Sequence, residues 1–226
     1  MNVVTGPQKG RLLSCGESAV LVEVADLDAV LVLEALVRER LQGRDRPWSD
    51  VLDVVPAART LLVTVRPGSP LEPLREVLGE LLPSVAGARP PAGDDAHVVH
   101  ISVVYDGPDL ADVARMTGLS PADVVAAHTG TRWQVAFGGF APGFAYLTGG
   151  DPRLEVPRRG EPRTRVPSGS VGLAGIFSGV YPRSSPGGWQ LIGSTQISLW
   201  DVDRDPPALL TPGSWVQFEE AAGDAP

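Results

Sequence analysis

The sequence is poor in the residues that build disulfides and metal clusters. It contains one cysteine, Cys15, a single lysine, Lys9, and three histidines in 226 residues. One cysteine excludes an intrachain disulfide and a thiolate metal cluster. With so few histidines as well, we expect no bound transition metal and predict no metal site on this chain.

Positive charge and long apolar runs are also scarce. Asp and Glu outnumber Lys and Arg by 27 to 19, which gives a net charge of −8 at pH 7 and argues against nonspecific nucleic-acid binding. No apolar run approaches the roughly 20 residues that a membrane span requires, and the N-terminus lacks the pattern of a secretory signal. We therefore expect a cytoplasmic protein that binds neither nucleic acid nor membrane.

Residues 1–84 have the pattern of a small α/β domain. Asp26 is a typical N-cap before a run of leucines and valines at helical spacing, and Gly43 is a typical C-cap. A second helix is predicted after the turn at residues 67–70. The predicted strands are residues 11–14, 19–24, 51–55 and 60–65. The order ββαββα predicts one sheet with two helices on one face.

Residues 85–96 are rich in proline and glycine without periodicity, which predicts a linker. The remainder, 97–226, reads as a second domain with two short helical segments after Asp109 and Ser120. Its later part alternates short apolar runs with Gly/Pro turns, which predicts a closed or nearly closed β-barrel. The strands that we expect are residues 97–105, 133–137, 171–177, 189–192, 196–200 and 216–218, followed by a tail at 219–226.

No standard catalytic motif is present. The chain has no P-loop, no H-E-x-x-H, no C-x-x-C and no G-x-S-x-G. No obvious set of nucleophile, base and orienting acid can be assembled either. If this protein takes part in catalysis, part of the machinery is expected on another chain.

A run of five arginines is the clearest candidate for recognition. Guanidinium groups pair bidentately with carboxylate or phosphate, so the run could bind an anion. The alternative is a solvated loop whose arginines pair with local acids. The run consists of Arg153, Arg158, Arg159, Arg163 and Arg165.

Three glycine-containing segments invite a similar pair of interpretations. Residues 138–144 and 186–189 would let the backbone approach a ligand closely beside aromatic side chains, although glycine also marks bulges at barrel corners. Residues 167–170 could form an anion-binding nest or a strand-entry turn. His128 ends a helical segment, where a cation is favourable, and an imidazole could also act as a general base.

Three long irregular motifs resemble the signatures of the KipI / allophanate hydrolase subunit 1 family, which includes the B-type subunit of bacterial ATP-dependent 5-oxoprolinase. They read FGGFAPGFAYL from Phe137, PRRGEPRTRVPSGSV from Pro157 and YPRSSPGGWQLIGST from Tyr181. The resemblance spans roughly residues 12–218. One departure is Gly193-Ser194-Thr195, where the family pattern has G-R-T, so that an arginine is missing.

The resemblance implies a cyclophilin-like barrel for the second domain and a subunit of a heteromeric hydrolase of cyclic or linear amides, such as 5-oxoproline or allophanate. It implies a subunit 2 (KipA-type) partner, and also a third partner, the A-type subunit, if the complex is a 5-oxoprolinase. ATP would be used by the complex, and the chain would be inactive alone. The alternative within the family is a KipI-like inhibitor of a sensor histidine kinase. A third hypothesis is a binding module that acts alone on a small acid.

The family resemblance favours a functional role for the motif residues. We expect His128, Tyr146 and Arg163 to be catalytic. The residues expected to bind the substrate or an anion are Gly139, Phe140, Pro142, Gly143, Phe144, Arg158, Arg165, Pro167, Ser168, Gly169, Ser170, Gly188, Trp189 and Thr195.

Overall fold

The computed structural model describes residues 10–90 and 98–221. The chain divides into two compact units, Met1–Ala92 and Gly93–Pro226. Part of the predicted linker, the first residue of the predicted second domain and the last five residues of the predicted tail lie outside the described residues. Within the described part, no helix has the length and apolarity needed to cross a membrane.

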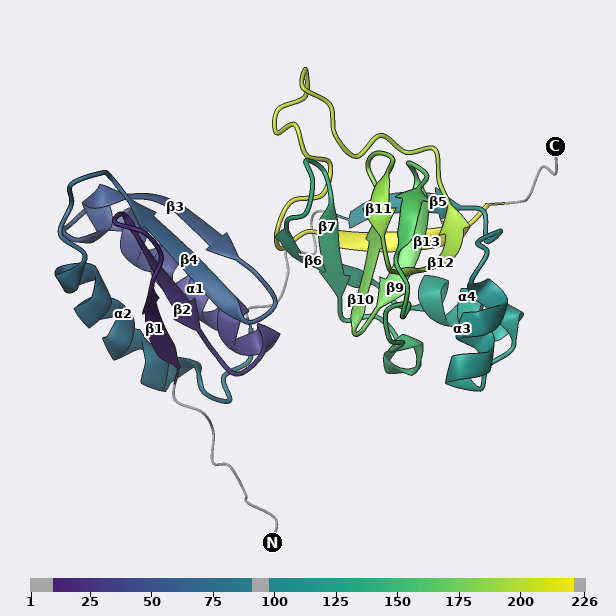
Figure 1. Cartoon of the computed structure of the whole chain (residues 1–226), viewed down its shortest axis with the longest axis horizontal. Coiled ribbons are helices and arrows are strands. Elements are labelled where there is room, and N and C mark those ends of the chain that lie inside the picture. Colours follow the sequence, from purple (N-terminus) through teal and green to yellow (C-terminus); the bar gives the residue numbers. More distant parts are fainter. Residues whose placement is uncertain (1–9, 91–97, 222–226) are drawn as a thin grey trace, which may run out of the picture. The chain divides into compact units, whose positions relative to one another are not determined.

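The first unit is an antiparallel four-stranded sheet with two helices, and its strand order is β1-β2-β4-β3 (Figure 1). The Asp26 side chain accepts a hydrogen bond from the backbone N–H of Ala29 at 2.9 Å and so begins α1 as predicted. The elements are β1 (Arg11–Ser14), β2 (Ala19–Glu23), α1 (Leu27–Gln42), a 3-10 helix (Trp48–Asp50), β3 (Val51–Pro56), β4 (Thr60–Val65) and α2 (Glu72–Val85).

One apolar core joins the sheet and both helices of this unit. Alternate residues of the strands, such as Val22 in β2 and Val63 in β4, are buried on one face of the sheet. They share a cluster with Leu33 of α1 and with Leu74 and Leu78 of α2. The predicted two-layer ββαββα domain is therefore confirmed.

The second unit is a nearly closed, mixed β-barrel with two helices. Its strand order is β12-β9-β10-β7-β6-β13-β5, and β13 pairs with β5 in parallel. The two edges meet where Val104 and Ser194 exchange backbone hydrogen bonds of 2.9 and 2.8 Å. The strands are β5 (Val98–Val103), β6 (Trp133–Gly138), β7 (Ala145–Thr148), β9 (Ser170–Ala174), β10 (Phe177–Val180), β12 (Gln190–Ser194) and β13 (Trp215–Glu220).

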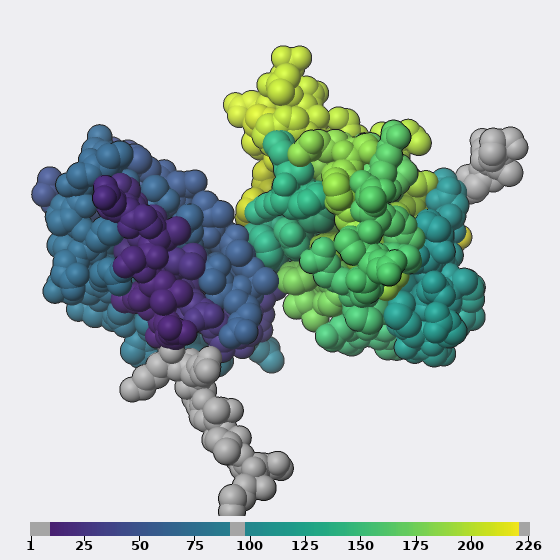
Figure 2. Space-filling model, in the orientation of Figure 1, coloured from purple at the N-terminus to yellow at the C-terminus, as the bar shows by residue number. Residues whose placement is uncertain are grey.

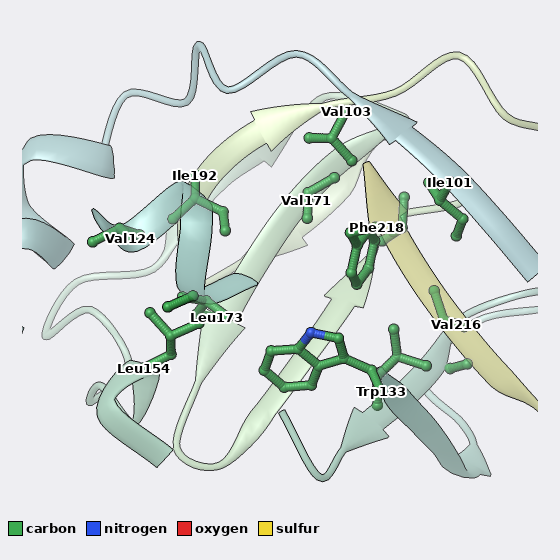
Figure 3. Packing of buried hydrophobic residues seen from close by; sticks show 14 of the residues in the cluster. Ile101, Val103, Val124, Trp133, Leu154, Val171, Leu173, Ile192, Val216 and Phe218 are labelled. Carbon is green, nitrogen blue, oxygen red and sulfur yellow. The ribbon is translucent and has the colours of Figure 1, made fainter. Parts of the chain in front are cut away.

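Further short elements surround the barrel and complete its core. They are α3 (Leu110–Thr117), α4 (Pro121–Gly130), a 3-10 helix (Pro152–Leu154) and a separate two-stranded sheet of β8 (Arg163–Val166) and β11 (Ser185–Gly187). Trp133, Phe218 and Leu173 lie in the centre of the core, which Figure 3 shows filled by strand and helix side chains. The predicted barrel is confirmed, and its parallel strand pair makes it a mixed barrel.

Two strand predictions and the predicted start of the tail are wrong in detail. The predicted strand 171–177 is a hairpin, because the chain turns at Gly175 with a φ of 56° between β9 and β10. Residues 196–200 form no strand and belong to the long segment between β12 and β13, which stands out from the body of the unit in yellow-green (Figure 2). The predicted tail begins too early, since β13 continues through Glu220.

Candidate functional site

An open pocket with a volume of about 510 Å³ lies in the second unit, and all three sequence motifs contribute to its wall. Six of its lining side chains are aromatic, and one carries a charge. Its lining residues are Phe140, Phe144, Tyr146, Pro157, Arg158, Ala174, Gly175, Phe177, Tyr181, Pro186, Gly187 and Trp189. The size lies within the range of small-molecule sites, and the aromatic wall with one charged group is typical of them.

The inner wall of the pocket is a set of aromatic rings that pack edge to face. The ring of Phe144 lies 5.1 Å from that of Tyr146, 5.4 Å from Trp189 and 5.5 Å from Tyr181, all at steep angles. Edge-to-face contacts at these separations are favourable. Phe144, Tyr181 and Trp189 are also buried, so their packing holds this wall in place.

Phe140 stands at the mouth of the pocket in a strained conformation. Its φ is 64°, which is rare for a bulky residue, and its side chain is 58% exposed. The loop is held by a hydrogen bond from the backbone N–H of Phe144 to the oxygen of Ala141 at 2.9 Å. Gly143 has a φ of 83°, and a Cβ there would lie 2.9 Å from that of Trp200. This loop therefore needs glycine at 143 and presents Phe140 to incoming molecules.

Arg158 supplies the only charge among the lining residues. It is exposed, and among the described residues no carboxylate lies within ion-pair distance of its guanidinium. The backbone on both sides is fixed: Gln190 Nε2 donates to the oxygen of Pro157 at 3.0 Å, and the N–H of Arg159 donates to the oxygen of Gly188 at 2.8 Å. A guanidinium on such a support is well suited to bind an anion.

Two tyrosines add polar groups to the pocket. Burial raises the pKa of Tyr146, and the positive charge of Arg158 opposes that rise. Burial also raises the pKa of Tyr181, against a smaller lowering by a backbone hydrogen bond at Trp189. Both phenols therefore remain neutral at physiological pH, and the Tyr146 hydroxyl can donate a hydrogen bond to a ligand oxygen.

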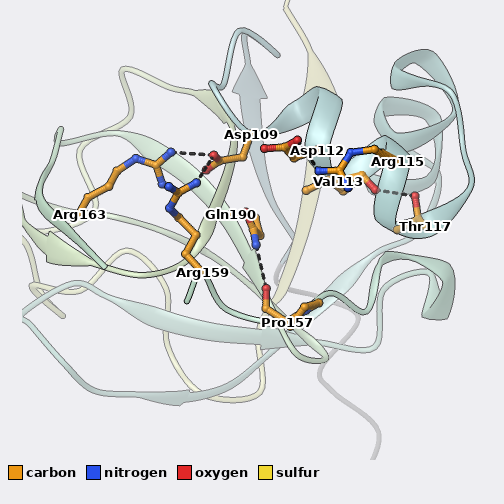
Figure 4. A network of polar contacts seen from close by, with 9 residues as sticks. All are labelled: Asp109, Asp112, Val113, Arg115, Thr117, Pro157, Arg159, Arg163 and Gln190. Atoms are coloured by element: carbon orange, nitrogen blue, oxygen red, sulfur yellow. Dashed lines mark hydrogen bonds and ion pairs between the residues drawn. The ribbon is translucent and has the colours of Figure 1, made fainter. Parts of the chain in front are cut away.

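Two other arginines of the run meet a buried carboxylate (Figure 4). Arg159 Nη1 and Arg163 Nη2 both donate to Asp109 Oδ1, at 2.8 and 2.7 Å. The other oxygen, Oδ2, accepts from the backbone N–H of Leu191 at 2.7 Å, and Asp109 is only 2% exposed. The structure thus places Arg163 in an internal ion pair. The sequence places Asp109 at a helix start but does not predict these ion pairs, because the partners of Asp109 lie 50 residues or more away.

His128 lies in the barrel core and does not line the pocket. Its Nδ1 is hydrogen-bonded to Tyr105 Oη at 2.7 Å and its Nε2 to Ser178 Oγ at 2.8 Å, while its ring stacks on Phe218. Burial lowers the pKa of His128 to about 3. It is therefore neutral, so it is no helix-end cation. Fully enclosed and paired at both nitrogens, it has no access to a substrate in this pocket, and the expected catalytic role finds no support in this placement.

Residues 167–170 form a strand-entry turn. The Gly169 N–H donates to the oxygen of Tyr181 at 2.7 Å, and a Cβ on Gly169 would lie 2.1 Å from the oxygen of Thr195. The Ser168 hydroxyl donates to the oxygen of Pro182, and Arg165 Nε donates to Ser184 Oγ. The nest interpretation is not supported. These predicted residues, Arg165, Pro167, Ser168, Gly169, Ser170 and Thr195, do not line the aromatic pocket.

The pocket contains five of the predicted site residues, namely Phe140, Phe144, Tyr146, Arg158 and Trp189. Gly139, Pro142 and Gly143 lie in the loop that carries Phe140, and a Cβ on Gly188 would lie 3.6 Å from Arg158 Nη2. Sequence reasoning missed Phe177 and Tyr181. The third motif contains Tyr181, so the motif was the available signal. In the described part of the chain, no group of three or more His, Cys, Asp or Glu is placed to hold a metal ion.

Comparison with known proteins identifies the family. A family model described as carboxyltransferase domain, subdomain C and D, matches residues 10–210. The chain belongs to this family. It is 40% identical over 216 residues to the B subunit of 5-oxoprolinase from Escherichia coli O157:H7, and the match covers 93% of this chain and 96% of that protein. The predicted resemblance is therefore confirmed.

Two solved structures share the fold of this chain. The protein TTHA0988 is 35% identical with a TM-score of 0.69, over 96% of this chain and 41% of that one. The Kluyveromyces lactis urea amidolyase has a TM-score of 0.72 at 19% identity, over 94% of this chain and 15% of that one, and it shows the fold alone. The chain thus spans less than half the length of these two proteins.

This chain has Ser194 where the family pattern has an arginine, and the structure shows where this residue lies. Ser194 pairs with Val104 at the closure of the barrel, and its hydroxyl donates to Asp106 Oδ1 at 3.0 Å. This position does not line the aromatic pocket. The missing arginine therefore removes no charge from the pocket, whose one charged lining residue is Arg158.

Proposed function

We propose that this chain is the B-type subunit of a heteromeric, ATP-dependent hydrolase that opens a small amide, with 5-oxoproline as the first candidate substrate. The observation that carries the proposal is the 40% identity to a protein named as the B subunit of 5-oxoprolinase, over nearly the whole of both chains. The named relatives do not favour the alternative, an inhibitor of a sensor histidine kinase.

The candidate substrate site of this chain is the aromatic pocket. A ligand such as 5-oxoproline has one carboxylate, one amide and an apolar ring edge. The guanidinium of Arg158 suits the carboxylate, the rings of Phe144 and Trp189 suit the ring edge, and the neutral Tyr146 hydroxyl suits the amide oxygen. These residues explain binding and orientation of the substrate.

The chemical step requires groups from other chains in this proposal. The residues that line the pocket include no nucleophile paired with a base, and His128 is enclosed in the core. We therefore assign the activation of substrate and the use of ATP to the complex with a subunit 2 (KipA-type) protein and the A-type subunit of 5-oxoprolinase. The chain alone is inactive, and the complex works in the cytoplasm.

Co-expression with the two partner proteins tests this function. Glutamate formation from 5-oxoproline and ATP hydrolysis are measured for the chain alone and for the purified complex, with and without ATP. Glutamate is expected only from the complex with ATP. An assembled complex that forms no glutamate would contradict the substrate, whereas failure of the chain to assemble with either partner would contradict its role within the complex.

A further inference from the structure

Asp109 is a buried carboxylate that the pocket does not use directly. It lies at the start of α3 and accepts hydrogen bonds from three donors: Arg159, Arg163 and the backbone N–H of Leu191 at distances of 2.7 to 2.8 Å. These donors come from the 157–163 segment and from β12. Asp109 therefore ties together three parts of the chain that are distant in sequence.

The charge balance makes both arginines depend on this one carboxylate. Two guanidinium groups share Asp109 Oδ1, so the cluster keeps a net positive charge. Arg159 Nε and Arg163 Nη1 are buried and have no hydrogen-bond partner among the described residues. An arginine cannot lose its proton to relieve this situation. Neutralising Asp109 would thus leave two positive charges side by side without a counter-ion.

The segment that Asp109 anchors also carries Arg158. Arg158 lines the pocket, while the next residue, Arg159, turns to Asp109. The backbone on either side of Arg158 is held by Gly188 and Gln190, and the following residue of β12, Leu191, donates to the same carboxylate. Each of the two hydrogen bonds that flank Arg158 therefore involves a residue that is itself bonded to Asp109 or adjacent to one that is.

We propose that Asp109 is a positioning residue for ligand recognition: it contacts no ligand, and it fixes the 157–163 segment so that the Arg158 guanidinium meets the carboxylate of the ligand. A bidentate guanidinium–carboxylate contact is sensitive to small displacements of the backbone. Loss of Asp109, although it lies away from the ligand, should therefore weaken this contact. The identity of the ligand, an acid with a small ring, rests on the proposed function; the role of Asp109 needs only that the ligand is a carboxylate.

Two pairs of ligands separate charge recognition from pocket shape. 5-Oxoproline is compared with 2-pyrrolidinone, the same ring without the carboxylate, and benzoate is compared with benzamide. Each is titrated into the full chain by isothermal titration calorimetry, because the chain has five tryptophans and its fluorescence would not report on Trp189 alone. Arg158→Ala should weaken binding of the acids about tenfold or more and change binding of the neutral partners less than about twofold. Arg165→Ala, an exposed arginine outside the pocket, is the matched control.

A double-mutant cycle then tests whether Asp109 acts through Arg158. Asp109→Asn should weaken binding of the acids about fivefold or more when Arg158 is present, and less than about twofold in an Arg158→Ala background. Binding of the neutral ligands should stay within about twofold. Asp112→Asn, which changes an exposed carboxylate on the same helix, is the control and should leave all four affinities unchanged. If Asp109→Asn does not fold, Arg159→Gln, which keeps the Arg163–Asp109 pair, takes its place with the same expectations.

Every outcome decides between the alternatives. Equal weakening of the acids and their neutral partners, or effects of Asp109→Asn and Arg158→Ala that simply add, would make Asp109 a structural residue only and overturn the inference. Binding of benzoate without binding of 5-oxoproline would contradict the proposed substrate. The double-mutant cycle measured with benzoate would then decide the role of Asp109. Binding of neither acid by the wild-type chain would overturn the inference itself.

Discussion

The core around His128 and the pocket beside Arg158 each place an ionisable side chain among aromatic rings, and they treat it in opposite ways. Both nitrogens of His128 are hydrogen-bonded, and its ring is enclosed. Arg158 is exposed and lacks a carboxylate partner among the described residues. An ionisable side chain can bind a ligand only where it is exposed and not already paired within the protein, whatever its residue type.

The chemistry of the two side chains explains the difference. Burying a charge without a partner is unfavourable, and a histidine avoids this by remaining neutral, as the lowered pKa of His128 shows. An arginine keeps its charge under all conditions that proteins experience. It must stay in water, as Arg158 does, or meet an acid, as Arg159 and Arg163 do at Asp109.

Removal of the His128 ring should have the largest effect on stability. His128→Ala would open a cavity beside Phe218 and leave the hydroxyls of Tyr105 and Ser178 without their partner. We expect the free energy of unfolding to fall by about 3–5 kcal/mol. Urea unfolding followed by circular dichroism measures it. Arg158→Ala should change the same quantity by less than about 0.5 kcal/mol; similar losses in both variants would erase the contrast between core and pocket.

Acid should destabilise the protein through His128. Its pKa is about 3 in the folded chain and about 6.5 when unfolded, so between these values only the unfolded chain takes up the proton. Stability therefore falls as the pH is lowered from 6.5 towards 3, and this group accounts for about 2 kcal/mol between pH 7.5 and 5. His128→Gln should remove that part of the pH dependence, whereas His100→Gln, at an exposed histidine, should preserve it. An unchanged profile for His128→Gln would show that His128 is accessible to protons.

Two arginines of β8 sharpen the comparison further. Arg163→Ala removes half of the ion pairing of the buried Asp109 and should lower the free energy of unfolding by about 2 kcal/mol. Arg165→Ala removes one hydrogen bond at an exposed position and should lower it by less than about 0.5 kcal/mol. Thermal and urea unfolding of the two variants provide the test. If Arg163→Ala abolished activity at unchanged stability, the expected catalytic role of Arg163 would regain support.

The smallest effect is expected at Phe140. Glycine adopts a φ of 64° without strain and alanine does not, so Phe140→Gly should be more stable than Phe140→Ala by about 1 kcal/mol. Because the ring is mostly exposed, both variants should lie within about 2 kcal/mol of the wild type. Both should bind pocket ligands more weakly. Equal stabilities of the two variants would mean that the loop relaxes and that Phe140 is not held under strain.

Most of the fold could be predicted from the sequence because its signals are local. The N-cap at Asp26 and the capping box at Ser120 begin helices where the sequence places them, and the first unit has the predicted order of elements. The errors arose where a local pattern allowed two outcomes. Residues 171–177 form an apolar run that reads as one strand, and only the positive φ at Gly175 turns it into a hairpin.

The site could be predicted only as a set of segments. The motifs contain most of the residues that line the pocket, yet the sequence led us to expect Arg163 to be catalytic and Arg158 to bind the substrate, and no local pattern indicates which of them reaches the pocket. What separates them is the partner Asp109, 54 residues before Arg163, and pairing over such distances leaves no local pattern. The same holds for His128, whose partner Ser178 follows 50 residues later. Contacts between residues distant in sequence thus determine which candidate side chains can reach a ligand.

The position of β13 has a consequence for biosynthesis. Among the described residues, this is the last strand of the chain; it lies between β5 and β6, and it carries Val216 and Phe218 into the core. A nascent chain therefore cannot complete the barrel until residues 215–220 have left the ribosome, and until then β5 and β6 expose open edges that can pair with other chains. A premature stop just before Trp215 should thus be as damaging to this unit as one near its middle.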